Sequence, residues 1–307
     1  IRACNDYLEH GTGKDWKEFE FKKDYAKMMR KYRNLEWEVK ALRAYYYFEL
    51  VKRYNRIPLI TKVLTEEEAN NQEPVDYQTV IDFIVRECDE VAEDGRLPAI
   101  YNADYDNETG RVSKIFALAL KARALLYAAS PLNNPNAETS PDKWIEAAKA
   151  AKKIMDASGS WNLSLVPFDQ LLGPDNFKAA EMILIKRIGD TNELEKLNFP
   201  IGLEGGKSGN CPTQNLVDAY DMKEGQEMDE ANPYANRDPR LAYTVLYHGG
   251  NTAYGKQVDV LPNGLNGLPQ EGATKTGYYL SKFVNINVSL TANNTTTARH
   301  SIPLFRY

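Results

Sequence analysis

The sequence has few of the residues on which metal and redox sites usually depend. Only three histidines occur among 307 residues, and none stands in an H-x-x-x-H or H-E-x-x-H pattern, so a zinc hydrolase is not expected. The three cysteines, Cys4, Cys88 and Cys211, form no C-x-x-C pair, which argues against a zinc ribbon or a redox pair. We expect them to be buried free thiols.

Long apolar runs and an excess of positive charge are also missing. No apolar stretch approaches the roughly 20 residues that span a bilayer, and no basic, signal-like segment opens the chain at Ile1. We therefore expect a chain trimmed at both ends. The net charge of −5 and the pI near 5.5 provide no basic field for nucleic acid.

Motifs for nucleophilic or phosphate chemistry are absent as well. The sequence has no G-x-S-x-G, G-x-x-x-x-G-K-[ST] or G-x-G-x-x-G motif. An acidic loop could hold calcium, but Asn107 and Ser113 stand where an EF-hand needs Gly and Glu. We interpret its oxygen-bearing residues as solvated: Asn102, Asp104, Asp106 and Glu108. The sequence thus predicts no cofactor, no metal site and no catalytic residue.

The first half of the chain has the pattern of long helices. Lys17–Tyr54 contains no Gly or Pro, and its apolar residues recur at helical spacing. Further helices are predicted over 77–91, Val112–Ala129 and Lys143–Ala157, the last with Asp142 as its N-cap. Four tryptophans accompany these segments: we expect Trp16, Trp37 and Trp144 in the core and a structural role for Trp161.

The second half is rich in Gly, Asn, Pro and Thr and has no long helical pattern. Short helices are predicted at 213–220 and 238–247, and short strands at 181–186 and 278–283. The long polar segments 200–212, 248–277 and 285–300 are typical of functional loops.

Together these patterns predict a mainly α protein. The motif at Ala41–Ala44 recurs at Ala119–Ala122, as in stacked helical hairpins of the tetratricopeptide (TPR) type. We expect a TPR-like helical scaffold over 1–160. A loop-rich, irregular ligand-binding subdomain with short strands would cover 161–307 and pack on this scaffold.

Several motifs in order along the chain resemble the SusD/RagB family of nutrient-binding lipoproteins. EVKALRAYYYFELVKRYNRIPLI resembles that family's E-x-x-x-L-R-A-x-x-Y-F-x-L-x-x-x-Y-G-x-x-P-L pattern, with Asn55 in place of the usual Gly. CPTQNLVDAYDMKEG resembles P-T-Q-x-L-V-D-A-Y/F-E. Further matches are GRVSKIFALALKARALLYAASP, WIEAAKAAKKIM, RDPRLAYTVLY and the terminal IPLFRY.

The resemblance implies a protein that binds a nutrient at the outer membrane without breaking a bond. A lipid-bearing cysteine upstream of Ile1 would anchor it to the cell surface. There it would hold an oligosaccharide for a SusC-like TonB-dependent transporter. Most residues of the shared motifs would be structural, with Arg43 and Arg123 bridging helices.

Sugar recognition needs aromatic faces and side chains that bond hydroxyl groups. We expect these in the variable loops rather than in the shared motifs. The predicted ligand-binding residues are Lys207, Asn210, Tyr234, Asn251 and Tyr254, with a second group of Tyr101, Asn102 and Tyr105.

Other functions are compatible with the same sequence. The protein could bind a peptide or glycopeptide in the same kind of uptake complex. It could instead be a TPR-like scaffold that only docks a protein partner. A glycoside hydrolase is a further alternative, because paired carboxylates are a spatial feature that sequence does not reveal.

Overall fold

The computed structural model describes all residues except 102–107, 137, 139–140, 251 and 254–255. The chain divides into two compact units. Unit 1 comprises residues 1–165, 180–185 and 304–307, and unit 2 comprises residues 166–179 and 186–303. Both units take in residues of strands β1 (Met182–Thr191) and β6 (Ala298–Arg306), which pair with each other.

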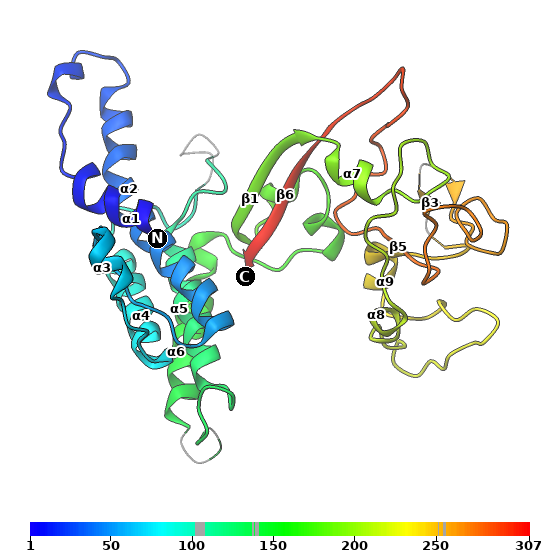
Figure 1. Cartoon of the computed structure of the whole chain (residues 1–307), viewed down its shortest axis with the longest axis horizontal. Helices are drawn as coiled ribbons and strands as arrows, with labels where there is room; N and C mark the ends of the chain where they lie inside the picture. The colour runs from blue at the N-terminus through cyan, green and yellow to red at the C-terminus, as the bar shows by residue number, and fades with distance from the viewer. Residues whose placement is uncertain (102–107, 137, 139–140, 251, 254–255) are drawn as a thin grey trace. The chain divides into compact units, whose positions relative to one another are not determined.

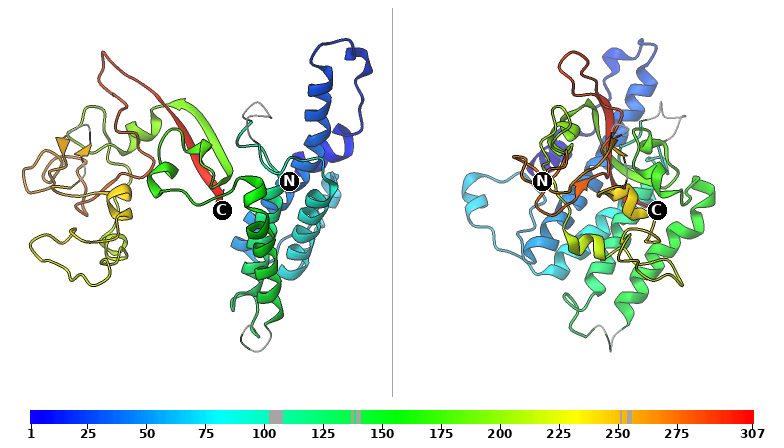
Figure 2. Two further views of the ribbon diagram at one scale, coloured as in Figure 1. Left: turned by 180° about the vertical axis from the view of Figure 1, so that it is seen from behind. Right: turned by 90° about the vertical axis from the view of Figure 1, so that its right-hand side faces the viewer.

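Unit 1 is built from helices, in agreement with the predicted mainly α class. Figures 1 and 2 show its long helices side by side. Each long helix packs on the next along the chain, in the order α2, α4, α5, α6. The helices are α1 (Arg2–Asp6), α2 (Tyr25–Tyr54), α3 (Glu66–Asn70), α4 (Tyr77–Asp94), α5 (Lys114–Ala129) and α6 (Asp142–Ala157).

The small residues of the helical motifs lie where the helices meet. Ala41 and Ala44 of α2 and Ala117 and Ala124 of α5 are fully buried. A small side chain allows neighbouring helices to approach each other closely. Larger buried side chains, such as Phe48, Ile84 and Phe116, belong to the same core cluster as these alanines. The alanine pattern therefore determines how tightly the helices pack.

Several details of the helical half differ from the prediction. The first long helix begins at Tyr25 instead of Lys17, because residues 17–24 are exposed and have no apolar face to bury. Asp142 is the first residue of α6, and Pro141 occupies the N-cap position without a side-chain hydrogen bond. Trp16 and Trp144 are 40% and 37% exposed, so their placement in the core was wrong.

Trp37 and Trp161 pack against the core of unit 1, as predicted. Cys4 and Cys88 are buried and Cys211 is half-buried, and all three are free thiols. Arg43 joins α2 to Glu87 of α4, which confirms its predicted bridging role. Arg123 lies over the ring of Phe305, at 3.7 Å from its centroid.

Helix α4 begins with a charged cap that gives a testable pH dependence. The carboxylate of Asp76 accepts hydrogen bonds from the backbone N–H and the hydroxyl of Thr79, both at 2.9 Å. These bonds lower the pKa of Asp76 below its ordinary value of 3.8. Stability from this carboxylate is therefore present above that ordinary value and is lost as the pH falls through the lowered pKa.

We expect Asp76→Asn to keep the cap and remove this titration. The difference in unfolding free energy between wild type and variant should be constant near neutral pH and change in favour of the variant below about pH 4. Urea unfolding at a series of pH values measures it. If the unfolding free energies of wild type and variant, plotted against pH, stayed parallel down to about pH 3, Asp76 would not have a lowered pKa in the folded protein.

Unit 2 consists mostly of turns and irregular segments joined by short elements. Its helices are α7 (Glu193–Asn198), α8 (Gln214–Asp218) and α9 (Arg240–Thr244). Strand β2 (Val245–Leu246) pairs antiparallel with β5 (Tyr279–Leu280), and β3 (Thr252–Ala253) pairs antiparallel with β4 (Lys256–Gln257). The predicted helices at 213–220 and 238–247 are present as the shorter α8 and α9. The predicted strand 278–283 contains β5, whereas the predicted strand 181–186 continues to Thr191 as β1.

The motif RDPRLAYTVLY, which resembles a SusD/RagB motif, makes hydrogen bonds that stabilise these short elements. Arg237 donates hydrogen bonds to the backbone oxygens of Val217 and Tyr220, at 3.2 and 3.1 Å. Asp238 accepts a hydrogen bond from the backbone N–H of Arg240 and forms an ion pair with its side chain. The predicted structural role of this cluster is thus confirmed.

Candidate functional site

Unit 2 contains a pocket of about 940 Å³. Residues of β1, α7, α9 and β6 line it, together with one residue each of β2 and β5 and the segments 172–174 and 281–286. These elements are far apart in the sequence, so the pocket exists only in the folded unit. Its size lies within the usual range for small-molecule sites.

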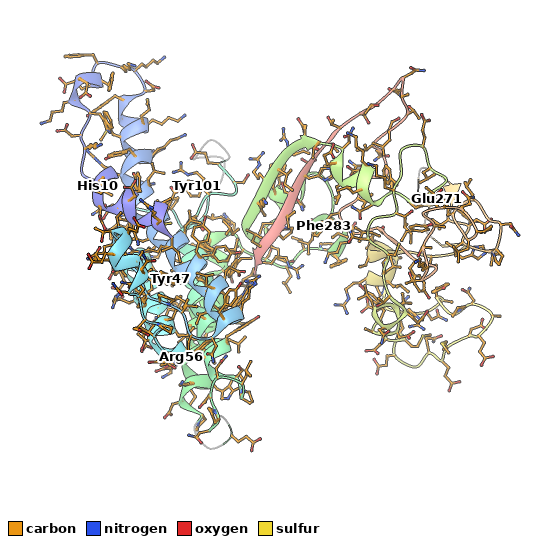
Figure 3. All side chains as sticks on the ribbon, viewed as in Figure 1. His10, Tyr47, Arg56, Tyr101, Glu271 and Phe283 are labelled. Atoms are coloured by element: carbon orange, nitrogen blue, oxygen red, sulfur yellow. The ribbon has the colours of Figure 1, made fainter. Side chains whose placement is uncertain are left out.

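Most of the pocket surface is apolar. Ile188 of β1, Leu197 of α7 and Tyr243 of α9 line it while remaining 48%, 51% and 43% exposed. The ring of Tyr243 meets Phe168 edge-on, with centroids 6.0 Å apart. Phe283, labelled in Figure 3, also lines the pocket. Exposed aromatic and aliphatic surface inside a concave site is suited to stacking on the C–H face of a ligand.

Charged and polar side chains occupy part of the same lining. Lys282 and Arg299 are the cations of the pocket, and Glu193 supplies a carboxylate. Glu193 forms an ion pair with Lys196 at 2.8 Å, which lowers its pKa. Arg299 lies 3.9 Å from the exposed carboxylate of Asp190. The pocket therefore combines apolar surface with hydrogen-bonding groups.

A buried carboxylate holds two segments of the wall in place. Glu195 of α7 is fully buried and lies 3.2 Å from the imidazole Nε2 of His300 on β6. Its other oxygen accepts a hydrogen bond from the backbone N–H of Asn285, at 2.9 Å. Because His300 and Asn285 both line the pocket, Glu195 ties β6 and the segment 281–286 to α7.

Helix α7 also connects the pocket with two predicted ligand-binding residues. The charge of Lys207 contributes to lowering the pKa of Glu193, so Lys207 lies within electrostatic range of the pocket edge. Asn210 donates a hydrogen bond to Asn198 at the end of α7, at 2.6 Å. The backbone N–H of Gly209 donates to the oxygen of Leu197. Both predicted residues are exposed.

Tyr234 lies in a tyrosine cluster close to the β2–β5 pair. Its ring stacks on Tyr247 with centroids 4.2 Å apart, and its hydroxyl lies 3.2 Å from that of Tyr278. Burial raises the pKa of Tyr234 and of Tyr247, so both remain neutral phenols. Leu246, which precedes Tyr247, lines the pocket. The tyrosine cluster thus lies next to the pocket wall along the chain, although its tyrosines do not line the pocket.

Lys207, Asn210 and Tyr234 lie near the pocket but do not line it, and the remaining predicted residues lie elsewhere. Tyr101 belongs to unit 1, where it is 6% exposed and donates a hydrogen bond to Glu38 at 3.0 Å. Burial raises its pKa. Asn102, Tyr105, Asn251 and Tyr254 lie outside the described residues.

The prediction overlooked Tyr243, Lys282, Phe283 and Arg299. Tyr243 stands within a shared motif that we interpreted as structural, yet its side chain is 43% exposed. Arg299 and Asn285 fall inside the polar segment 285–300, which the sequence did indicate as a functional loop. That signal was present, but it did not identify individual residues.

Within the part of the chain that the structure describes, no group of His, Cys, Asp and Glu residues is arranged to hold a metal ion. None of the helices described is both long and apolar enough to cross a membrane.

A protein-family model matches the part of the chain that contains most of the pocket lining. The SusD family model matches residues 188–307, which include all of the pocket lining except 172–174. This part of the chain is similar to the SusD family. The predicted resemblance is therefore confirmed, and most of the pocket lining falls within the matched residues.

Solved SusD-like structures extend the likeness to the whole chain. A SusD-like carbohydrate-binding protein from Bacteroides fragilis has 24% identity and a TM-score of 0.77, covering 100% of this chain and 56% of its own. A second SusD-like protein of that species has 22% identity and a TM-score of 0.73, covering 97% and 58%. A laminarin-binding SusD-like protein has 22% identity and a TM-score of 0.58, covering 100% and 62%.

These likenesses show that the chain has a SusD-like fold. The chain spans less than two thirds of the length of each of the three structures. A search of curated proteins finds no match.

Proposed function

We propose that this chain binds an oligosaccharide in the pocket of unit 2 and releases it chemically unchanged. The observation that carries the proposal is the pocket itself, in which an exposed tyrosine, Tyr243, lies among polar side chains. Sugars present apolar C–H faces and hydroxyl edges, and this lining complements both. Two proteins of similar structure, a SusD-like carbohydrate-binding protein and a laminarin-binding SusD-like protein, support this assignment.

The carboxylates of the pocket support binding without catalysis. Glycoside hydrolysis uses two carboxyl groups on either side of the scissile bond. Among the described lining residues Glu193 is the carboxylate in the wall, and the nearby Glu195 is buried and engaged with His300 and Asn285. We therefore expect incubation with a bound oligosaccharide to yield no cleavage product.

The wider role follows from the family. We propose that the protein is lipid-anchored at the outer-membrane surface and delivers its glycan to a SusC-like TonB-dependent transporter. In this scheme the helices of 1–160 form the scaffold, and 161–307 hold the ligand. Co-purification of the full protein with a transporter encoded beside it tests the partner.

Replacing Tyr243 with alanine tests the pocket directly. Loss of one stacking face should weaken oligosaccharide binding about tenfold, because such a contact contributes about 1–1.5 kcal/mol. Isothermal titration against an oligosaccharide panel measures the change. Tyr46→Ala is a matched control, since Tyr46 is 41% exposed and belongs to unit 1. Equal affinities for the two variants would contradict the assigned site.

The same pocket has one feature that favours a peptide. Its exposed aliphatic side chains, among them Ile188, Leu197 and Ile302, would suit apolar side chains of a peptide. A peptide library screened alongside the glycan panel separates the two functions. Binding of peptides alone, abolished by Leu197→Ser, would establish the peptide function in place of the glycan function.

A further inference from the structure

We infer that the pocket of unit 2 selects a sugar bearing a negative charge, specifically the carboxylate of a uronic acid. This inference rests on the proposed glycan-binding function and assigns a ligand class to the same site. It comes from the charges of the pocket wall, which differ in sign from the charge of the whole chain.

Two cationic residues line the pocket, Lys282 after β5 and Arg299 on β6. Lys282 is half-buried, and its ammonium lies 5.3 Å from the centroid of the Phe283 ring. No carboxylate among the described residues forms an ion pair with it within 4.0 Å. An ammonium group held beside an aromatic ring is ready to bind an anion, because no internal ion pair has to be broken first.

Arg299 is only weakly engaged by protein carboxylates. The nearest one, Asp190, lies 3.9 Å away, and both side chains are about half exposed or more, at 47% and 65%. Such a solvated contact contributes little energy. A guanidinium group matches the two oxygens of a carboxylate and can donate two parallel hydrogen bonds to it.

The negative groups of the pocket are already paired. Glu193 forms an ion pair with Lys196 and lies within the field of Lys207. Glu195 is fully buried and is occupied by His300 and the backbone of Asn285. Lys282 thus adds a positive charge to the lining that no ion pair among the described residues offsets, although the chain carries a net charge of −5.

The apolar part of the lining is the reason to expect an anionic sugar rather than an inorganic anion. An inorganic anion would use the two cations alone and leave Tyr243 and Phe283 without a partner. A uronic acid carries a carboxylate on a ring whose C–H face can stack on an aromatic side chain. The juxtaposition of aromatic surface with two available cations therefore fits an acidic sugar better than either a neutral sugar or a free anion.

The test compares oligogalacturonides with their methyl esters, which have the same length and linkage but no charge. We expect the acid to bind about tenfold more tightly than the ester to the whole chain, measured by isothermal titration. Lys282→Met and Arg299→Met should each weaken binding of the acid about tenfold and leave binding of the ester within about twofold. Higher salt should weaken only the acid.

Lys275→Met is the matched control. Lys275 is an exposed lysine of the same unit that does not line the pocket, so this variant removes one positive charge elsewhere. If it weakened the acid as strongly as Lys282→Met, the attraction would be a general charge effect and the inference would fail. A sulfated galactan that bound as tightly as the acid would also overturn the assignment to a carboxylate.

The outcomes distinguish this inference from the function on which it rests. Equal affinity for acid and ester, with Tyr243→Ala still weakening both, would overturn the charge selectivity and leave glycan binding intact. Failure of acid, ester and every neutral glycan to bind would overturn both.

Discussion

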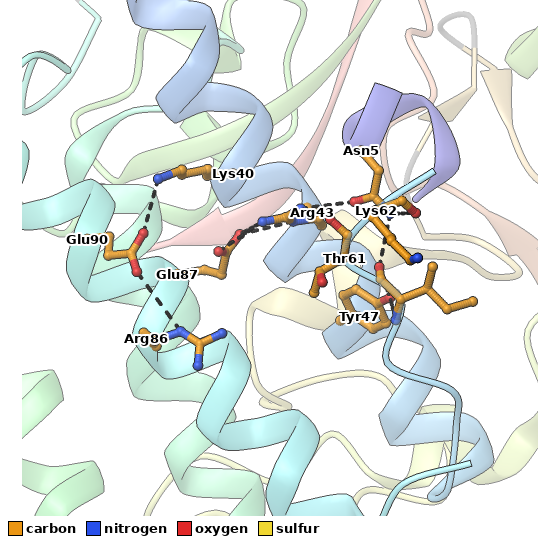
Figure 4. A network of polar contacts seen from close by, with 10 residues as sticks. Asn5, Lys40, Arg43, Tyr47, Thr61, Lys62, Arg86, Glu87 and Glu90 are labelled. Carbon is orange, nitrogen blue, oxygen red and sulfur yellow. Dashed lines mark hydrogen bonds and ion pairs between the residues drawn. The ribbon is translucent and has the colours of Figure 1, made fainter. Parts of the chain in front are cut away.

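Replacing Glu87 with alanine is expected to destabilise the helical unit by about 3–5 kcal/mol, because it would leave a buried guanidinium without its counter-charge. Arg43 and Glu87 are 8% and 5% exposed. Arg43 donates hydrogen bonds from Nε and Nη2 to both carboxylate oxygens of Glu87, at 2.8–3.1 Å. Its Nη1 donates to Asn5 and to the backbone oxygen of Thr61 (Figure 4).

A more exposed ion pair between the same two helices, α2 and α4, provides the control. Glu90 lies 3.1 Å from Lys40 and is 42% exposed (Figure 4). Solvent screens this pair, so Glu90→Gln should cost less than about 1 kcal/mol. Urea unfolding followed by far-ultraviolet circular dichroism measures both variants. If Glu87→Ala lowered the free energy of unfolding no more than Glu90→Gln does, the buried pair would not be a major source of stability.

A double replacement separates the pair from the space that it fills. Burial raises the pKa of the Glu87 carboxyl, and the charge of Arg43 opposes that shift. Desolvation of the carboxylate is therefore not fully offset by its partner. Arg43→Met combined with Glu87→Leu removes both charges and should be far less destabilising than Glu87→Ala alone.

Replacing Glu195 with alanine is expected to abolish most ligand binding by unit 2. This carboxylate is fully buried and joins α7 to His300 and to the backbone N–H of Asn285. Its loss leaves these groups without their partner, at a cost of about 2–4 kcal/mol. Because His300 and Asn285 belong to the pocket wall, we expect oligosaccharide affinity to fall roughly fiftyfold, equivalent to about 2.3 kcal/mol.

The conservative variant Glu195→Gln distinguishes positioning from a general loss of folding. A glutamine still accepts the hydrogen bond from Asn285, so it should recover part of the affinity. Amide hydrogen exchange should show faster exchange in 283–286 and 299–302 for the alanine variant only. Glu227→Gln, which alters an exposed carboxylate of the same unit, should match the wild type. Unchanged binding by Glu195→Ala would refute the positioning role.

The helical half was largely predictable because its signals are local. Apolar spacing and the positions of Pro and Gly located α4, α5 and α6 to within a few residues. The errors arose where burial rather than pattern decides the outcome. Trp16 and Trp144 have the chemistry of core residues, yet no neighbouring element covers them fully.

The site was predictable only in part. Lys207, Asn210 and Tyr234 do not line the pocket, and their predicted role in ligand binding stays a prediction. Tyr243 was missed because its motif resembles structural positions. Its exposure depends on how α9 meets Phe168, which is a contact between residues far apart in the sequence.

By itself the sequence determined the helical class, the likeness to the SusD family and the order of the long helices, since each of these depends on short-range patterns of residue type. Only the tertiary structure decided which side chains form the pocket. Its wall joins 172–174 to 299–302, and its charge balance depends on which carboxylates are buried and paired. Such properties arise from contacts across the chain, and no local pattern encodes them.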